Sequence, residues 1–183
     1  GRLPLWTASQ APTHVRRAAP AAIDLPESAV IIHPMLGAGP FGQGFEVELA
    51  SQAAFLAREL KRPVQLAWSQ VESLMHDRFR PAAKARMAAR LGVGGRVEGW
   101  VGKIAMPPAV RELRARMNGA DAYDAYAASR GAVDPLALDG ASPPYAIPAW
   151  AVDHHPADIG VPTGYWRGGG HAPAQPGGTA LAL

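Results

Sequence analysis

The chain has 183 residues, of which 48% are apolar and 18% charged, enough apolar side chains to bury a core of ordinary size. It contains no cysteine, which excludes disulfides, thiolate zinc sites and iron–sulfur clusters held by this chain. Its formal charge is only +3 and the basic residues are spread out, so a nucleic-acid-binding face is not predicted. No apolar run approaches the roughly 20 residues that a membrane-spanning helix needs.

The first part of the chain predicts alternating strands and helices. Residues 3–12 read as a short strand, and Pro20 interrupts the one or two helical turns expected after it. The β-branched run at residues 30–33 predicts a buried strand. Apolar residues at helical spacing predict a helix over residues 45–60: Phe45, Leu49, Ala53, Leu56 and Leu60. The run PVQLAWS at residues 63–69 then predicts another strand.

Further along the chain, three helices and one more strand are expected. Ser69 followed by Glu72 is the capping-box pattern, which predicts the start of a short helix. Residues 107–119 begin with proline and end with Asn-Gly, which predicts a second helix. Residues 121–131 favour a third helix, and residues 147–152 favour a strand within a Pro- and Gly-rich region.

A glycine turn at residues 92–95 predicts a hairpin that pairs residues 82–91 with residues 96–106. In that hairpin one face of the first arm carries Lys84, Arg86, Ala88 and Arg90. Its other face carries Ala85, Met87, Ala89 and Leu91. A helix is the alternative for this arm, because Ala and Arg favour helices. Together the elements predict an α+β fold, with a mixed or antiparallel sheet and helices packed on one side.

Three glycines between the predicted strand and helix spell G-x-G-x-x-G: Gly37, Gly39 and Gly42. A dinucleotide-binding turn would follow its strand directly and meet an acidic residue about 20 positions later. Here Pro34 separates the strand from the turn, Phe41 is bulky where the backbone must approach a pyrophosphate, and Glu72 comes too late. The pattern argues against a dinucleotide site. It leaves open a plain tight turn, or a glycine loop (residues 37–44) that serves another ligand.

The histidines do not predict a metal site. His154 and His155 are adjacent, so in an extended chain they point to opposite faces and are poor joint ligands. His33, His76 and His171 lack a neighbour at ligand spacing. A Ser-His-Asp hydrolase is not predicted either, because the chain has no G-x-S-x-G elbow.

Four segments stand in a recognisable order and spacing: WTASQAPTHVR, GAGPFGQGFEVELASQAAFLARELKRPVQLAWSQVESLMHDRFRPAA, ARLGVGGRVEGW and VPTGYWRGGGH. Together they resemble the molybdopterin-binding large subunit of the xanthine dehydrogenase and aldehyde oxidase superfamily. The resemblance is closest to the isoquinoline 1-oxidoreductase beta-subunit branch and spans residues 5–171. It implies a molybdenum-cofactor-binding-domain-like fold in a fragment of a longer subunit. We expect one domain over residues 1–183 with a disordered tail at residues 172–183.

The resemblance implies roles for particular residues. Gln10 matches the family glutamine that approaches the molybdenum oxo group, and Phe41 and Gly42 match the Phe-Gly of the family's glycine-rich loop. Arg167 matches an arginine on the substrate side of the metal centre, and the backbone N–H groups of residues 168–170 would be available to the cofactor. The implied cofactor-binding residues are Gln10, Gly39, Phe41, Gly42, Arg167 and Gly168. Convergent backbone amides and an arginine suit an anionic pterin pyrophosphate, and glycines let the backbone approach it.

The chain also departs from the family pattern. Ala38 replaces a glycine, Pro40 precedes Phe41, and Gln43-Gly44 stands where basic residues are usual. The family's catalytic base, a glutamate in a glycine-rich motif near the C-terminus of the full-length subunit, has no equivalent here, so no catalytic residue is assigned.

By resemblance, the parent enzyme oxidises an aldehyde or an N-heterocycle with oxygen from water. Its cofactor would be molybdopterin with molybdenum, as the cytosine dinucleotide. Because this chain has no cysteine, an iron–sulfur small subunit or domain is the expected partner. The isolated chain is expected to be inactive. The alternative is a non-catalytic structural or assembly domain that keeps the fold without binding cofactor.

Overall fold

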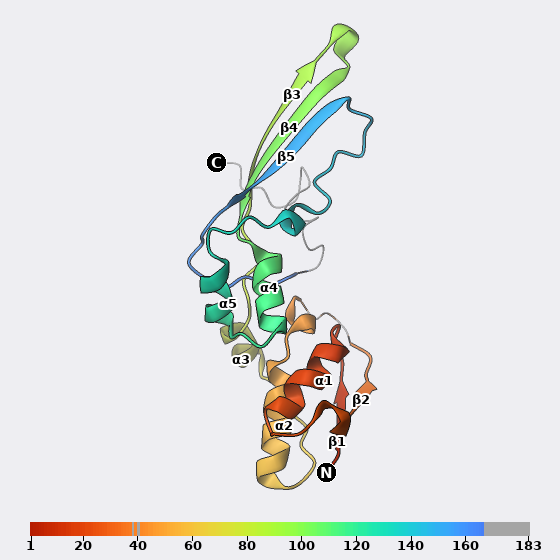
Figure 1. Cartoon of the computed structure of the whole chain (residues 1–183), viewed down its shortest axis with the longest axis vertical. Helices are drawn as coiled ribbons and strands as arrows, with labels where there is room; N and C mark the ends of the chain where they lie inside the picture. The colour runs from red at the N-terminus through yellow and green to blue at the C-terminus, as the bar shows by residue number, and fades with distance from the viewer. Residues whose placement is uncertain (38, 40, 167–183) are drawn as a thin grey trace. The chain divides into compact units, whose positions relative to one another are not determined.

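The computed structural model describes residues 1–37, 39 and 41–166 (Figure 1). The chain divides into two compact units, the first made of Gly1–Arg78 with Arg116–Ala120, the second of Phe79–Ala115 and the chain from Asp121 onward. None of the described helices has the length and apolar character needed to cross a bilayer. The single domain over residues 1–183 stays a prediction, and the predicted tail lies outside the described residues.

The first unit is built on two parallel strands, β1 (Leu3–Thr7) and β2 (Val30–Pro34), in register from Leu3 opposite Val30 to Thr7 opposite Pro34 (Figure 1). Helix α1 (Pro12–Ala21) connects them, as a crossover between parallel strands requires. Two further helices follow in the sequence, α2 (Glu48–Leu60) and α3 (Gln70–Met75).

Both longer helices of this unit pack on one face of the two-stranded sheet. The buried core residues come mainly from α1 and α2: Val15, Ala19, Ile23, Ala50 and Ala54. Leu3, Leu5 and Ile32 of the strands pack against this core. Because strand side chains alternate, Trp6 and His33 lie on the opposite face, where their rings stack with centroids 4.6 Å apart.

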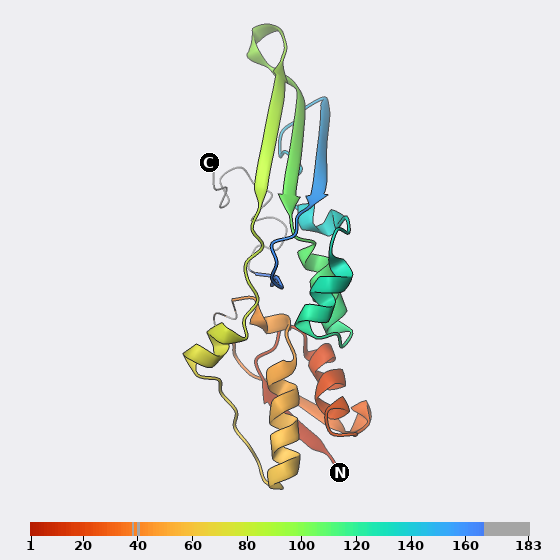
Figure 2. The ribbon, with the colours of Figure 1, turned by 90° about the vertical axis from the view of Figure 1, so that its left-hand side faces the viewer.

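The second unit contains a three-stranded mixed sheet in the order β3 (Lys84–Leu91), β4 (Val97–Met106) and β5 (Ala149–Pro156), shown side by side in Figure 2. Strand β4 is antiparallel to β3 and parallel to β5. Ile104 and Met106 of β4 form a small core with Ala137 and Ala141. Two helices follow β4, α4 (Ala109–Met117) and α5 (Ala122–Ser129), and the last two residues of α4 belong to the first unit.

The structure confirms the α+β fold and most of the predicted elements. The hairpin forms over β3 and β4, which excludes the alternative helix for its first arm. The Ser69 cap is present, because Ser69 Oγ accepts a hydrogen bond from the Glu72 N–H at 3.2 Å. The helix predicted over residues 45–60 is confirmed as α2, although it begins three residues later. His154 is buried and His155 exposed, as their opposite directions in a strand predict.

Four predictions of local structure were wrong in whole or in part. Residues 63–69 form no strand. The strand predicted at residues 147–152 is displaced to β5, because pairing with β4 continues as far as Pro156. Helix α1 runs through Pro20, which costs the helix one backbone hydrogen bond but does not shorten it by more than a residue, because α1 ends at Ala21. In β2 only Val30 is buried, since the sheet has just two strands and helices on one face.

Candidate functional site

The glycine loop leaves β2 and turns back through left-handed backbone conformations. The φ angle is +58° at Gly39, +43° at Phe41 and +98° at Gly42. A bulky residue with positive φ is unusual, and the left-handed conformation costs about 1–2 kcal/mol for a residue with a Cβ. Strain of this kind gathers at ligand-binding sites. The left-handed Gly42 precedes the helical turn Gln43–Phe45, a pattern that turns successive N–H groups toward one side.

Phe41 lies on the surface of the loop and not in the core. Its side chain is 66% exposed. A Cβ added to Gly39 would come within 2.8 Å of the Phe41 ring, so the ring lies directly against this glycine. The glycine at position 39 therefore makes room for the aromatic ring of position 41.

The segment that contains Gln10 lies against both ends of the glycine loop. The Gln10 N–H donates to the Gly44 carbonyl at 2.8 Å, and Ser9 Oγ donates to the same oxygen at 3.1 Å. A Cβ added to Gly44 would stand 2.2 Å from Gln10 Oε1, and one added to Gly37 would stand 3.0 Å from the Ala8 Cβ. A side chain at Gly37 would press on Ala8, and one at Gly44 would displace the Gln10 side chain.

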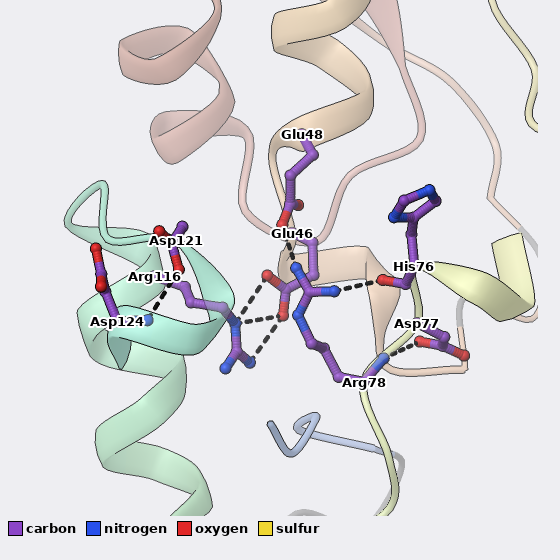
Figure 3. Close-up of polar contacts among 8 residues, drawn as sticks. All are labelled: Glu46, Glu48, His76, Asp77, Arg78, Arg116, Asp121 and Asp124. Carbon is purple, nitrogen blue, oxygen red and sulfur yellow. Dashed lines mark hydrogen bonds and ion pairs between the residues drawn. The ribbon is translucent and has the colours of Figure 1, made fainter. Parts of the chain in front are cut away.

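Two ion pairs hold the chain where it leaves the glycine loop and enters α2 (Figure 3). The Arg116 guanidinium donates to both carboxylate oxygens of Glu46, with N–O distances of 2.9–3.0 Å. The Arg116 side chain is buried at 3% exposure, and the Glu46 side chain is nearly so at 11%. Arg78 Nη2 donates to Glu48 Oε1 at 2.5 Å, and the Arg78 guanidinium also donates to the His76 carbonyl.

A hydrogen bond anchors the loop from a further side. Gln43 Nε2 donates to Ser73 Oγ of α3 at 3.0 Å. The N-cap of α2 is Val47, whose apolar side chain cannot accept a hydrogen bond from the first turn of the helix. The side-chain contacts of Gln43, Glu46 and Glu48 hold this end of the helix instead.

A cavity of about 1040 Å³ borders this assembly inside the first unit. One wall is β1 and the residues after it as far as Ser9, and the other is the extended segment 62–66. Alanines of one face of α2 also line it: Ala50, Ala53, Ala54 and Ala57. Gln43 and Gly44 of the glycine loop lie at its margin. The loop is thus next to a recess that is large enough for a ligand.

In the second unit, the stretch before Arg167 is held in place. Phe79 pairs with this stretch through its backbone, accepting from the Gly164 N–H at 2.8 Å and donating to the Pro162 carbonyl at 3.2 Å. The Thr163 N–H donates to Glu112 Oε2 at 2.7 Å, where both residues are buried. The guanidinium of Arg80 lies 5.0 Å from the centre of the Trp166 ring.

His154 is buried in the same unit, where both of its ring nitrogens form hydrogen bonds with backbone groups. The Asp134 N–H donates to its Nδ1 at 3.0 Å, so the other nitrogen, Nε2, carries the proton and donates to the Met106 carbonyl at 3.0 Å. Burial lowers the pKa of His154 below its ordinary value. A neutral ring fits these two partners, whereas protonated Nδ1 would face another N–H group. Within the described ranges, no three His, Asp or Glu side chains lie close enough together to hold a metal ion.

The structure places the predicted site residues as follows. Gln10, Gly39, Phe41 and Gly42 lie in one assembly in the first unit, while Arg167 and Gly168 lie outside the described residues. The contact of any of them with a cofactor stays a prediction.

Sequence reasoning missed the Glu46–Arg116 pair, which joins residues 70 positions apart. In the folded chain, one face of α4 is buried and carries two charges among its residues at helical spacing: Ala109, Glu112, Leu113 and Arg116. Charges on an otherwise apolar stripe indicate buried partners.

The comparison with curated proteins gives no match. Residues 1–106, more than half of the chain, match the family of the molybdopterin cofactor-binding domain. The match includes the Gln10 segment, the whole glycine loop and the β3–β4 hairpin. It ends before α4, so Arg116 lies outside it. The chain therefore belongs to the molybdopterin cofactor-binding domain family.

Proposed function

We propose that this chain is the molybdopterin-binding portion of a molybdenum hydroxylase of the xanthine dehydrogenase and aldehyde oxidase superfamily. The observation that carries the proposal is the contact between two motifs distant in sequence. Ser9 and Gln10 both donate to Gly44, which joins the glutamine segment to the end of the glycine loop. A plain tight turn between β2 and α2 would give no reason for this contact.

The residues present fit such a cofactor. An anionic pterin pyrophosphate needs backbone N–H groups that converge, and the left-handed Gly42 before a helical turn is a backbone pattern that supplies them. Gly42 and Gln43 would hold the cofactor through their amides, and Gln10 would approach it with its side-chain amide. The cofactor, when bound, supplies the redox chemistry at molybdenum. The chain would contribute binding, orientation and electrostatics.

Finer assignments belong to the same proposal. The order of the four resembling segments favours the isoquinoline 1-oxidoreductase beta-subunit branch, a cytosine dinucleotide form of the cofactor, and an aldehyde or N-heterocycle as substrate. Arg167 would stand on the substrate side of the metal centre, and the Gly168 N–H would be available to the cofactor. Since the chain has no cysteine, the iron–sulfur clusters that accept electrons would belong to a partner chain or domain.

The isolated chain should not turn over substrate. No glutamate in this sequence matches the family's catalytic base, and loss of a general base alone lowers rates by about 10²–10⁴-fold. Steady oxidation of any aldehyde or N-heterocycle by the purified chain would contradict this part of the proposal.

A second function is a structural or assembly domain that keeps the fold without binding cofactor. The observation that favours it is the changed loop sequence, in which Ala38 replaces a glycine, Pro40 precedes Phe41 and Gln43-Gly44 replaces the usual basic residues.

Metal analysis of the purified chain separates the two functions. The chain is produced in a host that makes molybdenum cofactor, and molybdenum and pterin are measured per chain. Gly42→Ala is the test variant and Gly119→Ala the matched control. Both glycines have a φ of +98°, so the added Cβ strains the backbone similarly at either position. Gly119 has open space around it.

The proposal expects molybdenum in the wild type and in Gly119→Ala, and a loss of most of it in Gly42→Ala. A wild-type chain that is free of molybdenum and pterin supports the structural alternative.

A further inference from the structure

We propose that Arg116 is a positioning residue, which fixes the exit of the glycine loop through Glu46 so that the loop amides stay arranged for the cofactor. The inference rests on the proposed function of this loop. It goes beyond the matched family segment, because Arg116 lies on α4, after residue 106. Arg116 is a positioning residue because it acts on the loop through the Glu46 carboxylate.

The first support is the geometry of the pair. Arg116 Nε is 3.0 Å from each Glu46 oxygen, and Nη2 is 2.9 Å from Oε1 (Figure 3). A guanidinium that meets both oxygens in this way fixes the direction of the carboxylate as well as its distance. Arg116 also stands in the last turn of α4, where the helix dipole favours a cation.

The second support is the short distance along the chain between Glu46 and the site. Glu46 follows the helical turn Gln43–Phe45, and its N–H closes that turn by donating to the Gln43 carbonyl at 3.0 Å. Gly44, in the middle of the turn, accepts the hydrogen bonds from Ser9 and Gln10. Fixing the Glu46 side chain therefore fixes the turn on which Gln10 rests.

The third support is that burial alone does not require charges here. A well-packed apolar pair of similar volume often gives the same or a greater stability than a buried ion pair. An apolar pair has no preferred orientation, whereas a guanidinium that contacts both carboxylate oxygens does. A loop with left-handed residues needs such an orienting contact to keep one conformation. The neighbouring Glu48–Arg78 pair is less suited to this task, because Glu48 is 38% exposed and already inside α2.

The test variant is the double substitution Glu46→Leu/Arg116→Met, which replaces the charges and keeps a similar side-chain volume. Arg116→Lys is the second variant, because it keeps the charge and loses the two-oxygen contact. The control is Arg17→Ala/Glu27→Ala, which removes an exposed ion pair of the same unit. Hydrogen exchange of backbone amides is measured in the cofactor-free chain, at the exit of the glycine loop (residues 42–46) and in the middle of α2. Exchange in residues 42–46 is termed loop exchange. Molybdenum per chain is measured after production in a cofactor-making host.

We expect the double variant to raise loop exchange by about tenfold or more while the middle of α2 keeps its protection. Arg116→Lys should raise loop exchange by a smaller factor, and the control should match the wild type. Molybdenum content should fall in the same order.

Unchanged loop exchange in the double variant would overturn the inference. So would an equal loss of protection across the whole first unit, since the pair would then be a general stabiliser. If even the wild type carries no molybdenum, the proposed function fails. The exchange data on the cofactor-free chain still decide whether Arg116 positions the loop.

Discussion

Removing Arg116 alone should be far more damaging than removing the whole ion pair. In Arg116→Met, the Glu46 carboxylate stays only 11% exposed and loses all three hydrogen bonds that the guanidinium donates to it. Breaking a buried pair in this way costs about 3–5 kcal/mol, because an uncompensated charge remains inside. For a chain of this size each kcal/mol shifts the melting temperature by roughly 2–4 °C. The expected loss is therefore about 6–20 °C.

The assay is thermal and urea unfolding of the wild type, of both single variants and of the double variant Glu46→Leu/Arg116→Met. Adding Glu46→Leu to Arg116→Met should recover most of the lost stability, because the orphaned charge is removed as well. The coupling energy of this cycle should then be a large fraction of the single-variant cost. A cost below about 1 kcal/mol for Arg116→Met would refute the reasoning. It would mean that the Glu46 carboxylate can turn to solvent without lowering the free energy of unfolding, as a surface carboxylate does.

Three further outcomes are expected. Because burial lowers the pKa of His154 from its ordinary 6.5, the unfolded chain takes up a proton there at higher pH than the folded chain does. Stability should thus fall as the pH drops below about 6.5 and level off below the folded-state pKa. His154→Gln should flatten this part of a melting-temperature profile between pH 7 and pH 5, and an unchanged slope in this variant would contradict the assignment. Phe41→Gly relieves a positive φ but adds freedom to the unfolded chain, so the unfolding free energy should change by less than about 1 kcal/mol. A urea titration that shows a loss above about 2 kcal/mol would point to packing by the ring. Gly44→Ala should displace the exposed Gln10 side chain, whose Oε1 would lie 2.2 Å from the new Cβ, at a cost of about 1 kcal/mol. A shifted NMR signal of the Gln10 side-chain amide would show the displacement, and a cost above about 3 kcal/mol would mean that the backbone contact breaks instead.

The elements that could be predicted from the sequence are those decided by neighbouring residues. The hairpin turn follows from glycines at positions 94 and 95, which both adopt positive φ. The start of α3 follows from the Ser69 hydroxyl, which satisfies one N–H group of the first turn. In both places the chemistry acts within four residues, and the rest of the fold does not overrule it.

Strands were harder, because alternation of side chains does not say whether a partner strand is present. In the segment 63–69, Val64, Leu66 and Trp68 are half-buried while the residues between them are exposed, as in a strand. The segment lines the cavity beside β1 but forms no ladder with it. Conversely, β5 extends beyond its apolar stretch because β4 offers a parallel partner as far as Met106. Pairing, and not propensity, sets where a strand exists and ends.

The candidate site depends on contacts between residues far apart in the sequence, which no local pattern predicts. The buried charges of α4 require such contacts. A charged side chain on a buried helical stripe is tolerated only with a partner, so Glu112 and Arg116 each require one. Glu112 accepts from the Thr163 N–H within the second unit, and Arg116 meets Glu46 within the first. Thr163 belongs to the segment VPTGYW, and Glu46 follows the glycine loop, so both partners lie in stretches that carry the family resemblance. The sequence predicts the helix α4, and only the folded chain shows that these two charges are buried and which partners they meet. A substitution in α4 can disturb either stretch without touching it in sequence.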